Sequence, residues 1–254
     1  MSARPLVVSV DGPSAAGKST VVARAAASFE WVPLAEAFDR IDPAPDLRYS
    51  SDRELEKLEG TLLEEDARRY RTALSLRARG LTVVTDTGFL GPLTYTAGLV
   101  ALGRAAPAVL RRLVARAREL ERRSAWGMPD VVAHLVASPS VRRARARGDR
   151  LGHPVDLERR HAAVGTWEER FLRTSLRSAF AGRVVVVRAD RGVDTVARTL
   201  RSAVRRIAPL PARSRAARDV LGLFAPAERA APDRAVPSSA TVKKPTRPDR
   251  PPRA

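Results

Sequence analysis

Residues 12–19 read Gly12-Pro13-Ser14-Ala15-Ala16-Gly17-Lys18-Ser19, which is the pattern G-x-x-x-x-G-K-[ST] of a phosphate-binding P-loop. An apolar run at residues 5–10 precedes this stretch, and a stretch rich in Ala and Val, with helical character, follows it. A strand, a glycine-rich loop and a helix in this order are the setting in which the motif binds phosphate. The sequence therefore predicts the strand, loop and helix that open a P-loop fold.

The residue types of this motif match the chemistry of a nucleoside triphosphate. Glycines let successive backbone N–H groups turn toward one anion, and the amino end of the following helix adds a positive field. In this pattern Lys18 reaches the β- and γ-phosphates, and the Ser19 hydroxyl binds Mg²⁺. We therefore predict ATP and Mg²⁺ as cofactors, with nucleotide-binding residues Gly12, Ser14, Ala15, Ala16, Gly17, Lys18, Ser19 and Thr20.

The choice of lysine at position 18 is itself informative. Of the 46 basic residues 42 are Arg, and Lys18 and Lys57 are the only lysines before the C-terminal stretch. A lysine places a compact point charge on a flexible stem, whereas arginine presents a broad planar fork. A chain that favours arginine so strongly, but has lysine at this position, supports a phosphate-binding loop over a chance glycine-rich turn.

Alternating strand and helix patterns predict an α/β fold. Such an alternation gives a parallel sheet with helices on both faces, the three-layer sandwich of P-loop NTPases. We expect strands at about 5–11, 31–35, 81–86, 130–137 and 184–187. We expect helices at about 18–29, 52–79, 92–124 with a break near Pro107, 139–150, 156–180 and 194–207.

The pattern divides the chain into a folded part and a tail. Residues 1–207 are expected to form a single P-loop domain, with an arginine-rich lid at about 139–152. Residues 208–254 are rich in Pro, Ala and Arg, a composition typical of a basic and mostly disordered tail. A short helix is expected at about 214–224. We expect it to fold back onto the domain, and the alternative is a docking peptide.

Composition limits the possible partners. The net charge of +18 favours contact with polyanions, but no nucleic-acid-binding motif is present and aromatic residues make up only 5% of the chain. Any binding to nucleic acid is therefore expected to be nonspecific. No apolar run approaches the roughly 18 residues of a membrane span. The chain has no cysteine and no pattern of a signal peptide, so we expect a cytoplasmic protein that does not enter membranes.

Three carboxylates lie where strands are expected to end, at the edge where ligands bind in such sheets. Asp86 is predicted to hold Mg²⁺ or to activate the acceptor hydroxyl, and the alternative is a turn or helix-capping role. Glu36 follows the second strand, where a general base would lie, although it could equally be a solvated side chain. Asp11 is either an indirect Mg²⁺ partner or a carboxylate that stabilises the loop.

The segment 140–150 carries five arginines in eleven residues: Arg142, Arg143, Arg145, Arg147 and Arg150. Arg143 and Arg147 are four residues apart and share one helix face. Phosphoryl transfer spreads negative charge over oxygens that arginines stabilise. We predict catalytic roles for Arg143 and Arg147 in a lid, together with Lys18, Asp86 and Glu36, and the alternative is a solvated basic helix.

These stretches resemble the P-loop nucleoside and nucleotide kinases, and in layout thymidylate kinases above all. Residues 8–20 also resemble the start of cytidylate kinases, residues 78–86 resemble the thymidylate kinase strand with a catalytic final Asp, and residues 129–149 resemble its fourth strand and arginine lid. The resemblance covers about residues 5–207. It implies a kinase domain, and it implies a homodimer as a possible assembly.

The chain departs from the thymidylate kinase pattern on the acceptor side. Thr87 stands where the family has Arg after the final Asp, and Ala35-Glu36-Ala37 replaces Arg-Glu-Pro. Arg68 and Arg69 are offset candidates for an acceptor-binding arginine. We therefore expect an ATP-dependent kinase of a small molecule other than thymidylate. The alternatives are an antibiotic or metabolite phosphotransferase on the same fold, or an ATP-binding regulatory or nucleic-acid-associated protein.

Overall fold

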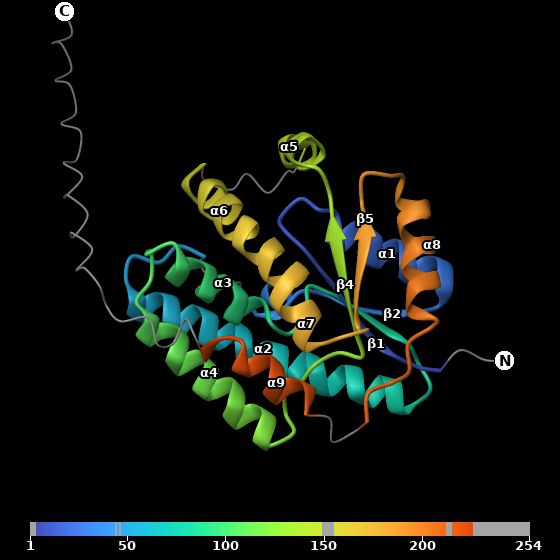
Figure 1. Cartoon of the computed structure of the whole chain (residues 1–254), viewed down its shortest axis with the longest axis horizontal. Coiled ribbons are helices and arrows are strands. Elements are labelled where there is room, and N and C mark those ends of the chain that lie inside the picture. The colour runs from blue at the N-terminus through green and yellow to red at the C-terminus, as the bar shows by residue number, and fades with distance from the viewer. Residues whose placement is uncertain (1–3, 44, 46, 149–154, 212–214, 226–254) are drawn as a thin grey trace, which may run out of the picture.

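A computed structural model of the chain describes residues 4–43, 45, 47–148, 155–211 and 215–225, without the side chains of residues 147–161. At its centre is a parallel five-stranded sheet with the order β2-β3-β1-β4-β5 (Figure 1). The strands are β1 (Val7–Asp11), β2 (Val32–Leu34), β3 (Val83–Asp86), β4 (Val131–Val136) and β5 (Val184–Arg188). The α/β sandwich predicted from the sequence is confirmed.

The central strands are apolar because helices cover them on both faces. Every residue of β1 and β3 is buried, as a parallel sheet inside a three-layer fold requires. One layer of helices contains α1 (Lys18–Phe29) and α8 (Val193–Val204), which contact each other (Figure 1). Their apolar sides and the facing side of the sheet form one buried cluster.

The opposite layer is larger and forms a second buried cluster. It contains α2 (Asp52–Ala78), α3 (Gly91–Ala101) and α6 (Val155–Phe171), which continues through a π-helical turn at Leu172–Leu176 into α7 (Arg177–Ala179). Outside them lie α4 (Pro107–Arg122) and α9 (Ala216–Gly222) (Figure 1). Within the described residues no helix is both long enough and apolar enough to span a membrane.

Local signals explain where several helices begin and end. The Ser51 hydroxyl accepts a hydrogen bond from the backbone N–H of Glu54 at 3.3 Å, so Ser51 is the N-cap of α2. Gly80 follows that helix with a left-handed φ of 86°, as expected for a residue just past a helix end. Pro107 occupies the first turn of α4, and this position separates α4 from α3 at the predicted break.

The predicted short helix near residue 220 is present as α9 and folds back onto the domain. Val220 and Phe224 are fully buried in the larger cluster, and the Phe224 ring stacks on Phe171 with 5.3 Å between centroids. The packed core therefore extends beyond residue 207. Of the tail predicted at 208–254, residues 212–214 and 226–254 lie outside the described residues.

Helix α5 (Pro139–Gly148) follows β4 and lies over the carboxyl ends of the strands (Figure 1). It is the described part of the predicted lid, and residues 149–152 of that prediction lie outside the described residues. Through this placement α5 contributes side chains to the same edge of the sheet as the P-loop.

Candidate functional site

A cavity of about 840 Å³ opens at the carboxyl ends of the strands. The segment after each strand contributes to its wall: the P-loop after β1, Glu36 after β2, Thr87 after β3, Arg145 of α5 after β4, and Arg191 after β5. Parallel strands bring these segments together although they are far apart in the sequence. This edge is where ligands bind in open α/β sheets.

The P-loop has the backbone that its glycines predict. Gly12 has a φ of 144°, and a Cβ there would lie 2.6 Å from the carbonyl oxygen of Leu135, so this position tolerates only glycine. Gly17 has a φ of 94° and precedes the first residue of α1. The predicted nucleotide-binding residues all line the cavity: Gly12, Ser14, Ala15, Ala16, Gly17, Lys18, Ser19 and Thr20.

Lys18 lies inside the loop rather than in solvent. Its Nζ donates to the carbonyl oxygen of Gly12 at 3.0 Å and to that of Pro13 at 3.4 Å. Neutral carbonyl groups hold the ammonium in place without cancelling its charge. The cavity therefore has one positive charge at the centre of its phosphate-binding loop.

Two carboxyl groups face this lysine from different elements. Burial raises the pKa of Glu36, with a further contribution from the charge of Asp86, whereas Lys18 lowers it. Burial also raises the pKa of Glu168, on α6, to about 7, against the opposing effect of Lys18. Both side chains line the cavity. A carboxyl whose pKa is raised accepts a proton more readily, so Glu36 and Glu168 both have an electrostatic property that a general base requires.

Sequence reasoning identified Glu36 but missed Glu168. Nothing in a helix-forming stretch with many charged residues distinguishes one inward glutamate from its neighbours. A close contact between Gly165 of α6 and Pro13 of the P-loop accounts for the position of Glu168. A Cβ on Gly165 would lie only 3.3 Å from the Cβ of Pro13. The small residue lets α6 approach the P-loop closely enough to place Glu168 in the cavity wall.

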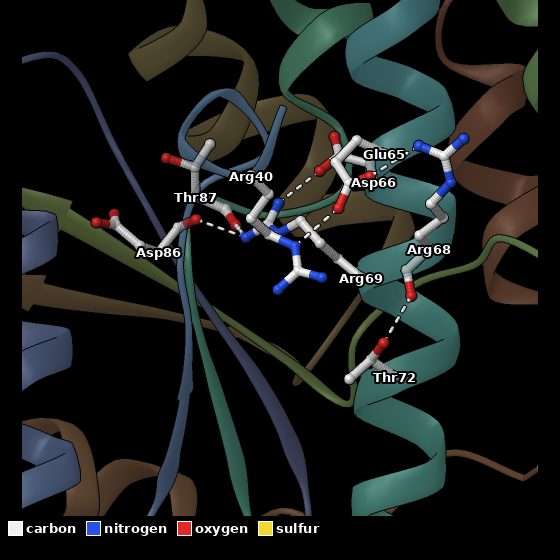
Figure 2. A network of polar contacts seen from close by, with 8 residues as sticks. All are labelled: Arg40, Glu65, Asp66, Arg68, Arg69, Thr72, Asp86 and Thr87. Atoms are coloured by element: carbon white, nitrogen blue, oxygen red, sulfur yellow. Dashed lines mark hydrogen bonds and ion pairs between the residues drawn. The ribbon is translucent and has the colours of Figure 1, made fainter. Parts of the chain in front are cut away.

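Asp86 is the last residue of β3, as predicted, but it does not line the cavity. The next residue, Thr87, does. Its carboxylate points away from Arg69, whereas its carbonyl oxygen points toward that guanidinium (Figure 2). Asp86 is 7% exposed, and its Oδ1 has no hydrogen-bond partner among the described residues. A buried carboxylate oxygen without a partner is unusual and requires an explanation, such as a cation.

Asp11 acts within the loop framework. Its carboxylate accepts one hydrogen bond from the Ser9 hydroxyl at 2.7 Å and another from the backbone N–H of Gly88 at 2.8 Å. Burial is the main influence on this group and raises its pKa. These contacts tie the segment after β3 to the strand before the P-loop, which is the loop-stabilising role considered for this residue.

On α5 a different arginine from the two predicted ones contacts the P-loop. Arg145 donates from Nη1 to the carbonyl oxygen of Ala16 and from Nη2 to that of Ala189, both at 2.7 Å. Arg143 is exposed and does not line the cavity. The side chain of Arg147 lies outside the described residues. Arg145 thus connects α5, the P-loop and the segment after β5.

The other end of the cavity is formed by α2, α3 and the segment 36–49. Arg69 of α2 is fully buried, forms an ion pair with Asp66, and donates to the carbonyl oxygens of Asp86 at 2.7 Å and Thr87 at 3.0 Å (Figure 2). Arg68 does not line the cavity and pairs with Glu65 at 2.9 Å (Figure 2). Of the two offset arginines considered for acceptor binding, one is therefore outside the cavity and the other is held by the protein.

Comparison with solved structures gives the fold a class. Deoxyadenosine kinase from M. mycoides with bound dATP is similar, with a TM-score of 0.61 and 16% identity, over 78% of this chain and 98% of that chain. The same enzyme with bound dCMP and dCDP is similar with a TM-score of 0.59 and 16% identity, over 79% of this chain and 100% of that chain. Thymidylate kinase from Candida albicans is similar with a TM-score of 0.56 and 14% identity, over 81% of this chain and 93% of that chain.

The architecture is therefore that of P-loop nucleoside and nucleotide kinases, and the resemblance expected from the sequence is confirmed at the level of fold. No protein-family model matches the sequence, and no curated protein matches it. At such low identity the comparisons establish how the backbone is arranged. The chemistry has to be argued from the residues in the cavity.

Proposed function

We propose that this chain is an ATP-dependent kinase that transfers the γ-phosphoryl group to a hydroxyl group of a small molecule. One observation carries the proposal: Lys18 in a complete P-loop and Glu36 after β2 line the same cavity. The first is the residue type that binds the transferred phosphate, and the second is a carboxyl with a raised pKa that can accept the proton of the acceptor.

In the proposed reaction the protein positions two substrates and stabilises charge. The N–H groups of the loop and Lys18 would bind the phosphates of ATP, with Arg145 on the side of α5. The acceptor hydroxyl oxygen forms a bond to the γ-phosphorus while the bond from that phosphorus to the bridging oxygen of ADP breaks. Glu36 takes the hydroxyl proton, and ADP leaves with the electron pair of the broken bond.

The residues present fit Mg²⁺ by donor type. Ser19 supplies a hydroxyl in the cavity wall, and Asp86 has a buried carboxylate oxygen with no partner among the described residues. These are hard oxygen ligands, which Mg²⁺ prefers. When bound, the ion would offset negative charge on the phosphates. Since the described residues contain no cluster of three metal-binding side chains, we propose that Ser19 and Asp86 hold it together with the nucleotide.

The proposal is tested by ADP release from the full chain with ATP and Mg²⁺. Acceptors are supplied as separate pools of nucleosides, nucleoside monophosphates and amino alcohols. The test variant is Lys18→Ala, and Lys57→Ala is the control because this second lysine is exposed and lies outside the cavity. We expect one pool to stimulate ADP release, and we expect Lys18→Ala to lower that rate about 100-fold or more.

The remaining alternatives give distinct results in the same assay. ATP binding that no acceptor pool stimulates would contradict the kinase and favour a regulatory nucleotide switch. Stimulation by amino alcohols alone would favour a metabolite or antibiotic phosphotransferase on this fold. A cytoplasmic location, nonspecific binding to polyanions and homodimer formation stay predictions from sequence.

A further inference from the structure

The part of the cavity wall formed by α2, α3 and the segment 38–49 contains an unusual set of side chains, which we call the α2 wall. It consists of the cavity-lining residues Phe38, Asp39, Leu47, Tyr49, Leu58, Glu59, Leu62, Asp66, Arg69, Pro92 and Tyr95. Aromatic residues are scarce in this chain, yet two of its three tyrosines lie here, with 3.4 Å between their hydroxyl oxygens. If the P-loop binds the donor, the α2 wall must receive the acceptor.

Acidic side chains predominate on the α2 wall. Asp39, Glu59 and Asp66 line it, and Glu36, whose pKa is influenced by Lys18, lines the same cavity. Among the described residues the cations lining the cavity are Lys18, Arg69, Arg145 and Arg191. Arg69 is the only one of these four on the α2 wall. Its Nη1 and Nη2 are occupied by Asp66 and two backbone carbonyls, and its Nε has no partner among the described residues.

Glu59 differs from the other acidic residues of the α2 wall because it is buried and has no ion pair among the described residues. Its side chain is only 4% exposed, it lines the cavity, and no hydrogen bond or ion pair holds it among the described residues. Its closest charged neighbour is Asp66, which is also buried and would repel it. A buried carboxyl without a charged partner keeps its proton near neutral pH, and a cation bound beside Glu59 would allow it to ionise.

We propose that the phosphate acceptor is a hydroxyl compound that also carries a protonated amine, and that Glu59 and Asp66 of the α2 wall bind this ammonium group. The inference rests on the proposed kinase function and names its substrate class. An ammonium would supply Glu59 with the N–H donors and the positive charge that it lacks among the described residues, and it would add a second cation beside Asp66, which already pairs with Arg69. The faces of Tyr49, Tyr95 and Phe38 also favour a cation.

A nucleoside monophosphate fits this wall poorly. Its phosphate would carry two negative charges into a region with three carboxyl groups, and the single arginine there is already paired. An uncharged nucleoside would avoid the repulsion but would leave Glu59 without a charged partner. The cationic acceptor is the class that satisfies both the charge and the hydrogen-bonding groups on the wall.

Two matched sets of acceptors test the inference with the full chain. The first is 3′-amino-3′-deoxythymidine, thymidine and thymidine 5′-monophosphate, and the second is glucosamine and N-acetylglucosamine. The value compared is kcat/KM from ADP release at pH 7. We expect the amine in a set to exceed its uncharged counterpart about tenfold or more, as for a hydrogen bond between charged groups.

Variants assign the preference to the α2 wall. Glu59→Gln keeps the shape but not the charge, and we expect it to abolish the preference for the amine while keeping the KM for ATP. Glu59→Asp keeps the charge and should retain a preference. Glu64→Gln is the matched control, because Glu64 lies on the same helix but pairs with Arg116 on the outer side. A preference for amines that Glu59→Gln leaves intact would overturn the assignment.

The outcomes separate this inference from the proposed function. If uncharged or phosphorylated acceptors are the better substrates, the kinase stands and the cationic acceptor is refuted. If ATP binds but no compound in either set, nor any pool of the earlier assay, stimulates ADP release, then the kinase function itself fails.

Discussion

Replacing Glu59 by Gln should make the protein less sensitive to alkaline pH. Glu59 lies on the buried face of α2, and burial, with a smaller effect of Asp66, raises the pKa of its carboxyl from 4.5 to about 8. Between about pH 5 and pH 8 the folded protein therefore keeps a proton that the unfolded chain has released. The free energy of unfolding falls as the pH rises through this window, because the folded state binds more protons than the unfolded state.

The magnitude follows from linkage. One group with these two pKa values changes the free energy of unfolding by at most about 1.4 kcal/mol for each pH unit. Over the three units from pH 5 to pH 8 the limit is about 4 kcal/mol, and we expect at least about 2 kcal/mol because the wall is partly open to water. Glutamine has nearly the same shape and no proton to lose. Relative to wild type, Glu59→Gln should therefore gain this amount of stability as the pH increases.

The assay is urea unfolding of the full chain at pH 5, 6, 7 and 8 at constant ionic strength. The quantity compared is the difference in unfolding free energy between Glu59→Gln and wild type, which removes the titration of all other groups to first order. Glu64→Gln serves as the control, because it is the same substitution on the outer side of the same helix. A difference that stays constant with pH, or that decreases toward pH 8, would refute the reasoning about burial.

Three further substitutions test other parts of the structure. Asp130→Ala removes a buried carboxylate that accepts from the backbone N–H of Val7 at 2.7 Å and pairs with Arg77 at 2.7 Å, so urea unfolding should show a loss of about 3–5 kcal/mol. Arg145→Ala should weaken ATP binding about tenfold in calorimetry, and a larger effect of Arg143→Ala would contradict our placement of the lid. Gly88→Ala would place a Cβ 2.6 Å from Oδ2 of Asp11, so we expect the free energy of unfolding to fall by about 1–3 kcal/mol and ADP release to slow. An unchanged melting temperature would contradict this close contact.

The strands and the P-loop could be predicted from the sequence because their signals are local. A buried parallel strand is a short apolar run, and the P-loop needs glycine where the backbone is left-handed or closely packed. Gly12, for example, lies against the carbonyl oxygen of Leu135, where a Cβ would not fit, and the P-loop motif has a glycine at this position. The helix 18–29 was predicted with the bounds that the structure has, since it begins directly at Lys18.

The phase of α5 could not be predicted in the same way. Arg143 and Arg147 share one face, and Arg142 and Arg145 share another, so the sequence offers two arginine faces. An apolar stripe would normally indicate which face is inward, but Val141 is the only large apolar residue in this helix. Hydrogen bonds from Arg145 to the carbonyl oxygens of Ala16 and Ala189 show which face points inward. Both residues are far from α5 in the sequence.

The sequence of α2 also contains a pattern that indicates the acidic residues of the α2 wall. Leu55, Leu58, Leu62 and Leu63 define the apolar face of α2. Glu59 lies four residues after Leu55 and Asp66 four after Leu62, so both fall on that face. A carboxyl on the buried side of an amphipathic helix indicates either a salt bridge or a ligand. Asp66 has the salt bridge with Arg69, and Glu59 has none among the described residues.

The P-loop and the α2 wall, two parts of the same cavity, are therefore formed by different features of the chain. The P-loop end is formed by backbone at the ends of strands, and the fold that places these strand ends is shared with solved structures even at 16% identity. The α2 wall is formed by side chains, which can change without disturbing the sheet. Similarity of fold therefore gives no information on the acceptor. The charges on the α2 wall are the structural feature that selects the acceptor, and Glu59 is where that selection can be measured.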